Sequence, residues 1–252
     1  KTPLKSLDWS KVDRPRPEFT GVKSFDHIPI EEIEPFIDWS PFFWSWELKG
    51  SYPAILEHAK YGVEATKIFK DAQELLKKMK REKILRPRAV IGFWPANSNG
   101  DDIEIYADET RAQTLETFCM LRQQKEQCRS LADYVAPKST GLTDYIGAFA
   151  VSAGHEIDVL AEKYKRENDD YMSIMTKAIG DRLAEGLAEM MHKRVRDYCG
   201  YGRTENLTSD QLIREEYRGI RPAPGYPACP EHTEKVKLMR LLEAAKNSGV
   251  TL

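Results

Sequence analysis

Hydrophobic and polar positions follow two different periods along the chain, and these separate helical parts from extended ones. Over residues 62–83, apolar side chains recur at steps of three and four, which is typical of an amphipathic helix. A short helix is also expected over residues 155–165. A long one is expected over residues 169–198, started by Asp169 and Asp170 and ended by Gly200. Shorter helices are expected over residues 30–34 after Pro29, over residues 211–217 after a cap at Ser209, and over residues 233–247.

Strand patterns lie between these helices. Residues 88–94 are mostly apolar and stop at Pro95, residues 102–106 alternate between polar and apolar, and turn-forming residues separate the two, so we expect a hairpin. Further strands are expected over residues 114–121 and 145–151, and the second should lie centrally in the sheet because it is apolar throughout. Helices on either side of a central group of strands predict an α+β fold.

The first 25 residues differ from the rest of the chain. Pro3, Pro15 and Pro17 disfavour regular structure there, so residues 1–25 are expected to form an irregular arm or linker. The remaining residues, 26–252, are enough for one large domain with a buried core.

Composition excludes several classes of protein. The formal net charge is −2, from 38 basic and 40 acidic residues that are interspersed, so no basic stripe is present and nucleic acid is not an expected partner. No apolar run approaches the roughly 20 residues that span a bilayer, so no membrane partner is expected. The four cysteines lack the spacing of a disulfide framework, which favours free thiols and a cytoplasmic location.

Residues 221–230 hold four prolines, which make a rigid loop. Arg221 can pair bidentately with a carboxylate, Gly225 allows a ligand to come close, and Tyr226 offers a ring and a hydroxyl group. These features fit a small zwitterion that carries an aromatic base. The alternative is a stiff connector in which Arg221 pairs with a structural carboxylate.

Acidic residues offer a second candidate site. Asp181, Glu185 and Glu189 lie four apart on one helix face, with Arg182 alongside and His192 below. The face is either simply hydrated or meets a cationic partner, such as a sulfonium ligand or an imidazolium. Asp38 lies in an aromatic cluster at residues 36–46, where it could hold an ammonium group or cap a turn.

The chain lacks the usual signatures of catalysis and metal binding. Cys229 and His232 form one C-x-x-H pair without a second pair, and His155-Glu156 lacks the second histidine of a metalloprotease motif. The oxygen-bearing side chains around residues 97–102 do not follow calcium-loop spacing. No phosphate-binding glycine loop or nucleophile motif is present, so neither a catalytic residue nor a metal site is expected.

Five stretches resemble the activation domain of cobalamin-dependent methionine synthases, in that family's order. The most specific is RPAPGYPACPEH at residues 221–232. The others are residues 37–43, residues 92–97 with 101–103, residues 131–137, and residues 181–185.

The resemblance implies a C-shaped single domain whose bent antiparallel sheet is flanked by helices, with S-adenosylmethionine in a shallow groove. It implies that Asp38, Glu185 and Arg221 hold the polar ends of the ligand. The backbone around Ala223, Gly225 and Tyr226 would line it, while Asp181 and Arg182 would contact the cobalamin-binding domain of the same enzyme.

The chemistry implied is reductive remethylation of cob(II)alamin, with S-adenosylmethionine as methyl donor. Cobalamin would be carried by the neighbouring domain, and a flavodoxin-like or diflavin reductase would supply the electron. One alternative is an interaction module that docks the reductase or the cobalamin domain without binding ligand. Another is a methyltransferase of a different class, which the lack of a glycine-rich strand–helix loop disfavours.

Two departures from the family pattern affect the expected site. The chain ends at Leu252, whereas the resemblance implies a further strand-containing segment with a ligand-contacting tyrosine. The stretch between Gln124 and Leu131 is also shorter than the family pattern.

Overall fold

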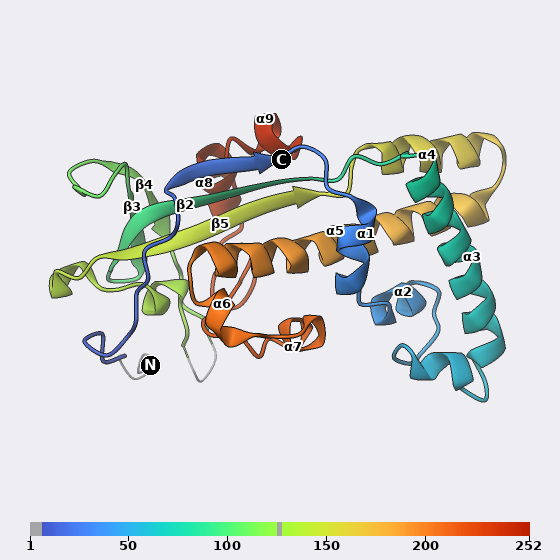
Figure 1. Ribbon diagram of the computed structural model, residues 1–252, viewed down its shortest axis with the longest axis horizontal. Helices are drawn as coiled ribbons and strands as arrows, with labels where there is room; N and C mark the ends of the chain where they lie inside the picture. Colours follow the sequence, from blue (N-terminus) through green and yellow to red (C-terminus); the bar gives the residue numbers. More distant parts are fainter. Residues whose placement is uncertain (1–6, 125–127) are drawn as a thin grey trace. The chain divides into compact units, whose positions relative to one another are not determined.

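The computed structural model describes residues 7–124 and 128–252 (Figure 1). The expected shortening between Gln124 and Leu131 therefore falls partly on residues 125–127, outside the described residues. The chain forms two compact units, each built from separate segments. The first unit combines residues up to Ser24 with Val90–Ala150 and His192–Leu252, and the second combines Phe25–Ala89 with Val151–Met191.

Five strands in the described residues form one sheet, and their presence beside the helices confirms the expected α+β class. They are β1 (Gly21–Phe25), β2 (Arg88–Asn99), β3 (Asp102–Tyr106), β4 (Thr114–Cys119) and β5 (Asp144–Ser152). The order is β1-β2-β3-β4, and β5 also pairs with β2, so that β1, β2 and β5 run side by side in Figure 1. β2 with β3, and β3 with β4, pair in the antiparallel direction.

The expected hairpin is present, but its first strand is longer than predicted. β2 continues through Pro95 and pairs with β3 from Ala96↔Ile105 to Asn99↔Asp102. Pro95 precedes the first of these pairs, so its missing N–H removes no bond from that ladder. The turn is correspondingly tight, with Gly100 at φ 64°.

Two other strand expectations were wrong. Within the described residues, β5 pairs only with β2, so this apolar strand lies at an edge and not in the centre; most of its residues are half-buried. Residues 1–25 were expected to be irregular throughout, yet Gly21–Phe25 forms β1. The middle of β1 is exposed, so its sequence lacks the alternation that marks a half-buried strand. The division into an arm and a domain of residues 26–252 stays a prediction.

The core of the first unit joins the sheet to the end of the chain. Val90, Ile103 and Ile105 from the strands pack in one cluster with Leu242 and Ala244. The helix expected over residues 233–247 is divided into α8 (Glu234–Leu241) and α9 (Ala244–Ser248). Between them Glu243 has φ 46°, and this break lets both Leu242 and Ala244 reach the core.

Two short helices precede the proline-rich loop in this unit, α6 (Gly202–Glu205) and α7 (Ser209–Ile213). Thr208, not Ser209, caps α7, through a capping box with Gln211. The helix ends at Ile213, four residues before the expected Tyr217, because its last turn closes at Arg214. Two 3-10 turns, Leu131–Tyr134 and Lys138–Thr140, complete the described elements of the first unit.

The second unit is mainly helical and has an aromatic core. Its elements are α1 (Ile30–Ile33), a 3-10 turn at Glu34–Phe36, α2 (Ser40–Ser45), a 3-10 turn at Ala54–Glu57, α3 (Gly62–Arg81) and α4 (Glu156–Arg166). Trp39 contacts both Phe42 and Phe69 edge to face, with ring centroids 5.4 and 5.1 Å apart. The expected helix over residues 62–83 is thus confirmed, with its apolar face buried.

The longest helix, α5 (Asp170–Tyr198), has residues in both units. Asp169 accepts a hydrogen bond from the backbone N–H of Met172 at 2.9 Å, which satisfies one free donor at the start of the helix. Gly200, at φ 92°, follows the end of the helix as expected. No helix in the described part of the chain is long and apolar enough to cross a membrane.

Candidate functional site

The proline-rich loop of residues 221–230 is closed by its own backbone hydrogen bonds. Gly225 donates to the carbonyl of Cys229 at 2.7 Å, and Cys229 donates to that of Tyr226 at 2.9 Å. Tyr226 in turn donates to the carbonyl of Ala223 at 2.9 Å. Since the four prolines also fix φ, the loop presents Ala223, Gly225 and Tyr226 in one defined conformation.

Two anchors hold this loop to the first unit. Cys229 is buried in the core cluster, and burial raises the pKa of its thiol, which stays neutral. The backbone N–H of Leu131 donates to the carbonyl of Ala228 at 2.9 Å. The loop is therefore positioned by a residue 97 positions earlier in the sequence.

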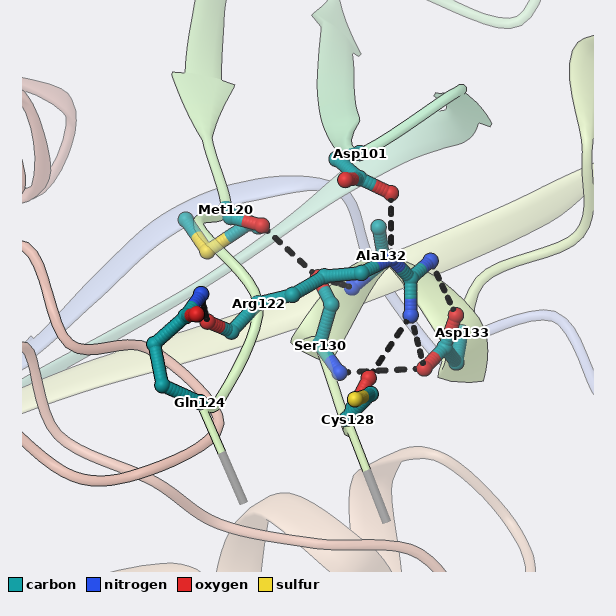
Figure 2. Close-up of polar contacts among 8 residues, drawn as sticks. All are labelled: Asp101, Met120, Arg122, Gln124, Cys128, Ser130, Ala132 and Asp133. Carbon is teal, nitrogen blue, oxygen red and sulfur yellow. Dashed lines mark hydrogen bonds and ion pairs between the residues drawn. The ribbon is translucent and has the colours of Figure 1, made fainter. Parts of the chain in front are cut away.

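Leu131 is itself positioned by a partly buried network around Arg122. Figure 2 shows the guanidinium group of Arg122 between two carboxylates. It donates to both oxygens of Asp133, at 2.9 and 2.7 Å, and to Asp101 at 2.7 Å. Asp133 also accepts from the backbone N–H of Ser130 at 3.0 Å, and the Ser130 hydroxyl donates to the Met120 carbonyl at 2.9 Å. Bidentate pairing of this kind is strong and also holds the two side chains in a defined orientation.

Gly225 is required by its surroundings. Its φ of 108° is outside the range that other residues adopt readily, and a Cβ atom there would lie 2.3 Å from Cε1 of His232. The glycine thus rests directly on the imidazole ring. Beside it, the Tyr226 side chain is 63% exposed and free to contact a ligand.

Arg221, half-buried at the start of the loop, contributes positive charge near a buried histidine. Burial, together with the smaller effect of the positive charges of Arg221 and Arg196, lowers the pKa of His192 to about 3. The His192 ring contacts Tyr217 edge to face at 4.6 Å, and its Nδ1 has no hydrogen-bond partner among the described residues. His192 is therefore a neutral, buried side chain and not an imidazolium beside the acidic face.

The acidic face of α5 is largely exposed. Asp181 and Glu185 are exposed, while Arg182 and Glu189 are half-buried. Exposed carboxylates stacked at intervals of four repel one another weakly, and a cation beside them would remove that cost. This face is available to a charged partner or ligand.

Asp38 lies before α2 and is exposed, although its aromatic neighbour Trp39 is buried. One of its carboxylate oxygens accepts from the backbone N–H of Ser40 at 2.9 Å, so the capping role is present. The preceding Ile37 packs against α5, since a Cβ added to Gly186 would lie 3.0 Å from its Cγ1. Asp38 and Glu185 are the chain neighbours of these two residues, so this contact brings their segments together in the second unit.

The structure thus assembles two groups of expected site residues. Arg221, Ala223, Gly225 and Tyr226 share one loop of the first unit, and Asp38, Asp181, Arg182 and Glu185 belong to the second unit. The sequence interpretation missed the supporting roles of His232 and of the Arg122 network. The sequence signal for the role of His232 was the motif at residues 221–232, which contains both Gly225 and, seven positions later, His232.

No group of three or more histidine, cysteine, aspartate or glutamate side chains among the described residues is arranged to hold a metal ion.

Comparison with known proteins identifies the family. The family model described as "Vitamin B12 dependent methionine synthase, activation domain" matches residues 29–252. The chain is also similar to a crystal structure of the MetH reactivation domain bound to AdoHcy, with 50% sequence identity and a TM-score of 0.93. That alignment covers 100% of this chain and 82% of the other. The chain therefore belongs to the activation, or reactivation, domains of vitamin B12-dependent methionine synthase.

Proposed function

We propose that this domain binds S-adenosylmethionine and presents its methyl group for reductive remethylation of cobalamin. The observation that carries the proposal is the closed loop of residues 221–230, which offers Arg221 and an exposed Tyr226 on a rigid backbone. The half-identical relative that is bound to AdoHcy, S-adenosylhomocysteine, supports the choice of ligand, because this is the demethylated product of such a donor.

The proposed contacts follow the charges of the ligand. Arg221 pairs with the amino-acid carboxylate, because a guanidinium fork matches its two oxygens. Asp38 holds the ammonium group through the oxygen that Ser40 leaves available. Glu185 faces either the sulfonium or a sugar hydroxyl, and the backbone at Ala223, Gly225 and Tyr226 lines the remainder.

The role of this domain in the reaction is positioning. Cobalamin, carried by the neighbouring domain, supplies the nucleophile when it is reduced. The methyl carbon leaves the sulfonium sulfur, and the electron pair of the broken C–S bond stays on sulfur, so S-adenosylhomocysteine needs no protonation. The residues of this chain hold the donor in one orientation, which explains why no general base is required.

Partners are also part of the proposal. Asp181 and Arg182, beside the ligand-holding Glu185, contact the cobalamin-binding domain. A flavodoxin-like or diflavin reductase docks on the domain and donates the electron. The exposed acidic face of α5 supports the first of these contacts, because its charges can meet a complementary surface.

Calorimetric titration of the chain with S-adenosylmethionine tests the proposal. Arg221→Ala should weaken binding by roughly 2–4 kcal/mol, because it removes a charge-assisted bidentate pair. Arg214→Ala is the matched control, since Arg214 is exposed and makes only surface contacts in the described structure, with the Asp210 carbonyl at 3.3 Å and with Glu216 at 3.8 Å. Unchanged affinity in a folded Arg221→Ala protein would remove Arg221 from the site.

A comparison of two ligands separates the roles of the carboxylates. S-adenosylmethionine carries a sulfonium that S-adenosylhomocysteine lacks, whereas both carry the ammonium group. Asp38→Asn should weaken both ligands equally. If Glu185 faces the sulfonium, Glu185→Gln should narrow the difference in affinity between the two ligands. If Glu185 faces a hydroxyl, the affinity for both ligands should fall equally. A chain that binds neither ligand but still docks the reductase would favour the interaction-module alternative.

A further inference from the structure

A basic pocket in the second unit lies outside the residues assigned to S-adenosylmethionine. It has a volume of about 420 Å³ and is lined by Asp26, His27, Lys83, Arg86 and Arg88. All five residues belong to the second unit, so the pocket is formed within one compact part of the chain. A volume of this order is ordinary for a small-molecule site.

Local structure brings the two lining segments together. The backbone N–H of Ile28 donates to the carbonyl of Pro87 at 3.0 Å, which fastens the segment of Asp26 and His27 to that of Arg86 and Arg88. Leu85, 2% exposed, fixes the connection between α3 and β2 from inside. The pocket walls therefore rest on a buried leucine and a backbone hydrogen bond, not on flexible side chains alone.

A turn at Lys83 and a hydrogen bond at Arg86 fix the backbone of this connection. Lys83 has φ 50° and so reverses the chain directly after α3, where its N–H donates to Lys80. The backbone N–H of Arg86 donates to the Glu156 carboxylate at 3.4 Å, so Glu156 holds the backbone and not the guanidinium group.

The cations that line the pocket lack counterions. Among the described residues, the side chains of Lys83, Arg86 and Arg88 make no ion pair or hydrogen bond, although Arg88 is half-buried. By contrast, the half-buried Arg122 pairs with Asp133 and the buried Arg196 pairs with Glu205. Like charges gathered in one concavity repel one another, and an anion bound there would remove that repulsion.

We propose that this pocket binds the phosphate group of a small anionic molecule. Three cations against the single carboxylate of Asp26 leave two positive charges, with His27 counted as neutral. A phosphate monoester carries about −1.5 to −2 charges near pH 7, so the charges match. The two guanidinium groups provide forked donors that suit phosphate oxygens, and the volume leaves room for the rest of the molecule.

Titration of the 252-residue chain with pyrophosphate, at ionic strength held constant with potassium chloride, tests this proposal. We expect saturable binding, followed by calorimetry and by NMR shifts of the amides around Arg86 and Arg88. Arg86→Gln and Arg88→Gln should each weaken binding by about tenfold, because each removes charge-assisted bonds. Lys67→Gln, which removes an exposed charge from α3 in the same unit, should change it less than twofold.

Three results would overturn the proposal. These are the absence of saturation, equal affinity in the two arginine variants and the parent chain, and tighter binding of citrate than of pyrophosphate, which would indicate a carboxylate site. The Arg86 side chain is exposed, so Arg86→Gln should fold normally, and circular dichroism of each variant checks this. Retained S-adenosylmethionine binding in these variants would show that the two sites are separate.

Discussion

At the scale of single residues, the proline-rich loop depends on the absence of a side chain at Gly225. Its positive φ and the imidazole ring of His232, 2.3 Å from the position of a Cβ atom, both exclude larger residues. Gly219 has a comparable φ of 83° but has no atom within 4 Å of that position. An alanine at Gly219 would therefore meet backbone strain alone, whereas an alanine at Gly225 would meet both backbone strain and a steric clash.

Gly219→Ala should lower the free energy of unfolding by about 1–2 kcal/mol through strain alone. Gly225→Ala should lower it by a further 1–3 kcal/mol or so, because the methyl group overlaps the His232 ring. His232→Ala in the Gly225→Ala background should recover part of that second loss. Urea denaturation of the four proteins measures these differences, and equal losses in the two single glycine variants would contradict the steric role of His232.

His192 illustrates how burial decides the state of a residue. Its pKa is lowered to about 3 from an ordinary value of 6.5, chiefly by burial. The unfolded chain thus takes up a proton at a higher pH than the folded chain does. Stability from the neutral ring is complete above about pH 6.5 and is lost as the pH falls toward 3.

Replacement by an uncharged residue should reduce this pH dependence. Between about pH 7.5 and about pH 4.5, His192 should account for roughly 2–3 kcal/mol of the decrease in the free energy of unfolding. Over the same pH range, the free energy of unfolding of His192→Gln should decrease by that much less than the free energy of unfolding of the parent chain. Urea denaturation at the two pH values measures it, and parallel decreases in both proteins would show that His192 does not titrate as described.

At the scale of elements, α5 carries the acidic face and also the small residues that let other segments approach. Gly186 contacts Ile33 and Ile37, and Gly180 contacts Ile157 of α4. Each glycine costs about 1 kcal/mol of helix stability relative to alanine, but it lets the neighbouring segment pack closely. Only the Gly186 contact lies beside Asp38.

The two glycines allow a matched comparison. Gly186→Val and Gly180→Val should each lower the free energy of unfolding by about 1–3 kcal/mol through overpacking. Only Gly186→Val should also weaken S-adenosylmethionine binding, because it displaces the segment that carries Asp38. Denaturation and calorimetry of both variants test this. Equal S-adenosylmethionine affinity in the two variants would show that the Gly186 contact does not position Asp38.

At the scale of the whole molecule, the two units are interleaved in sequence, since each contains separate segments of the chain. The proposed site residues accordingly come from positions 38 to 226. On one face of α5, Asp181 lies four residues, or about one helical turn, before Glu185. The residue proposed to contact the cobalamin-binding domain is thus one turn away from a residue proposed to contact the ligand. Ligand binding and docking to the cobalamin domain should therefore be separable.

Asp181→Asn should leave the S-adenosylmethionine affinity of the isolated chain nearly unchanged but slow reductive reactivation of the intact methionine synthase. The reason is that its exposed carboxylate lies outside the proposed ligand-holding set. Asp158→Asn, an exposed aspartate of α4, is the control. Equal reactivation rates for Asp181→Asn and the parent enzyme would remove Asp181 from the proposed contact surface.

Sequence alone determined the elements whose signals are local. The apolar period specified α3 to within two residues, because a long amphipathic pattern has few alternative structures. The acidic residues at the start of α5 and Gly200 after its end specified that helix equally closely. The prolines of residues 221–230 specified a rigid loop, since proline fixes φ wherever it stands. The family motifs also pointed to Asp38, Glu185 and Arg221, whose proposed contacts with the ligand the variants above test.

Tertiary structure decided what depends on partners distant in sequence. The edge position of β5, the break at Glu243 and the neutral state of His192 follow from what surrounds each residue. Arg122 and Asp133, and Leu131 and Ala228, meet only after the chain has collapsed. Local patterns record the conformation that a segment prefers by itself, whereas strand neighbours, burial and ion pairs are properties of the packed chain.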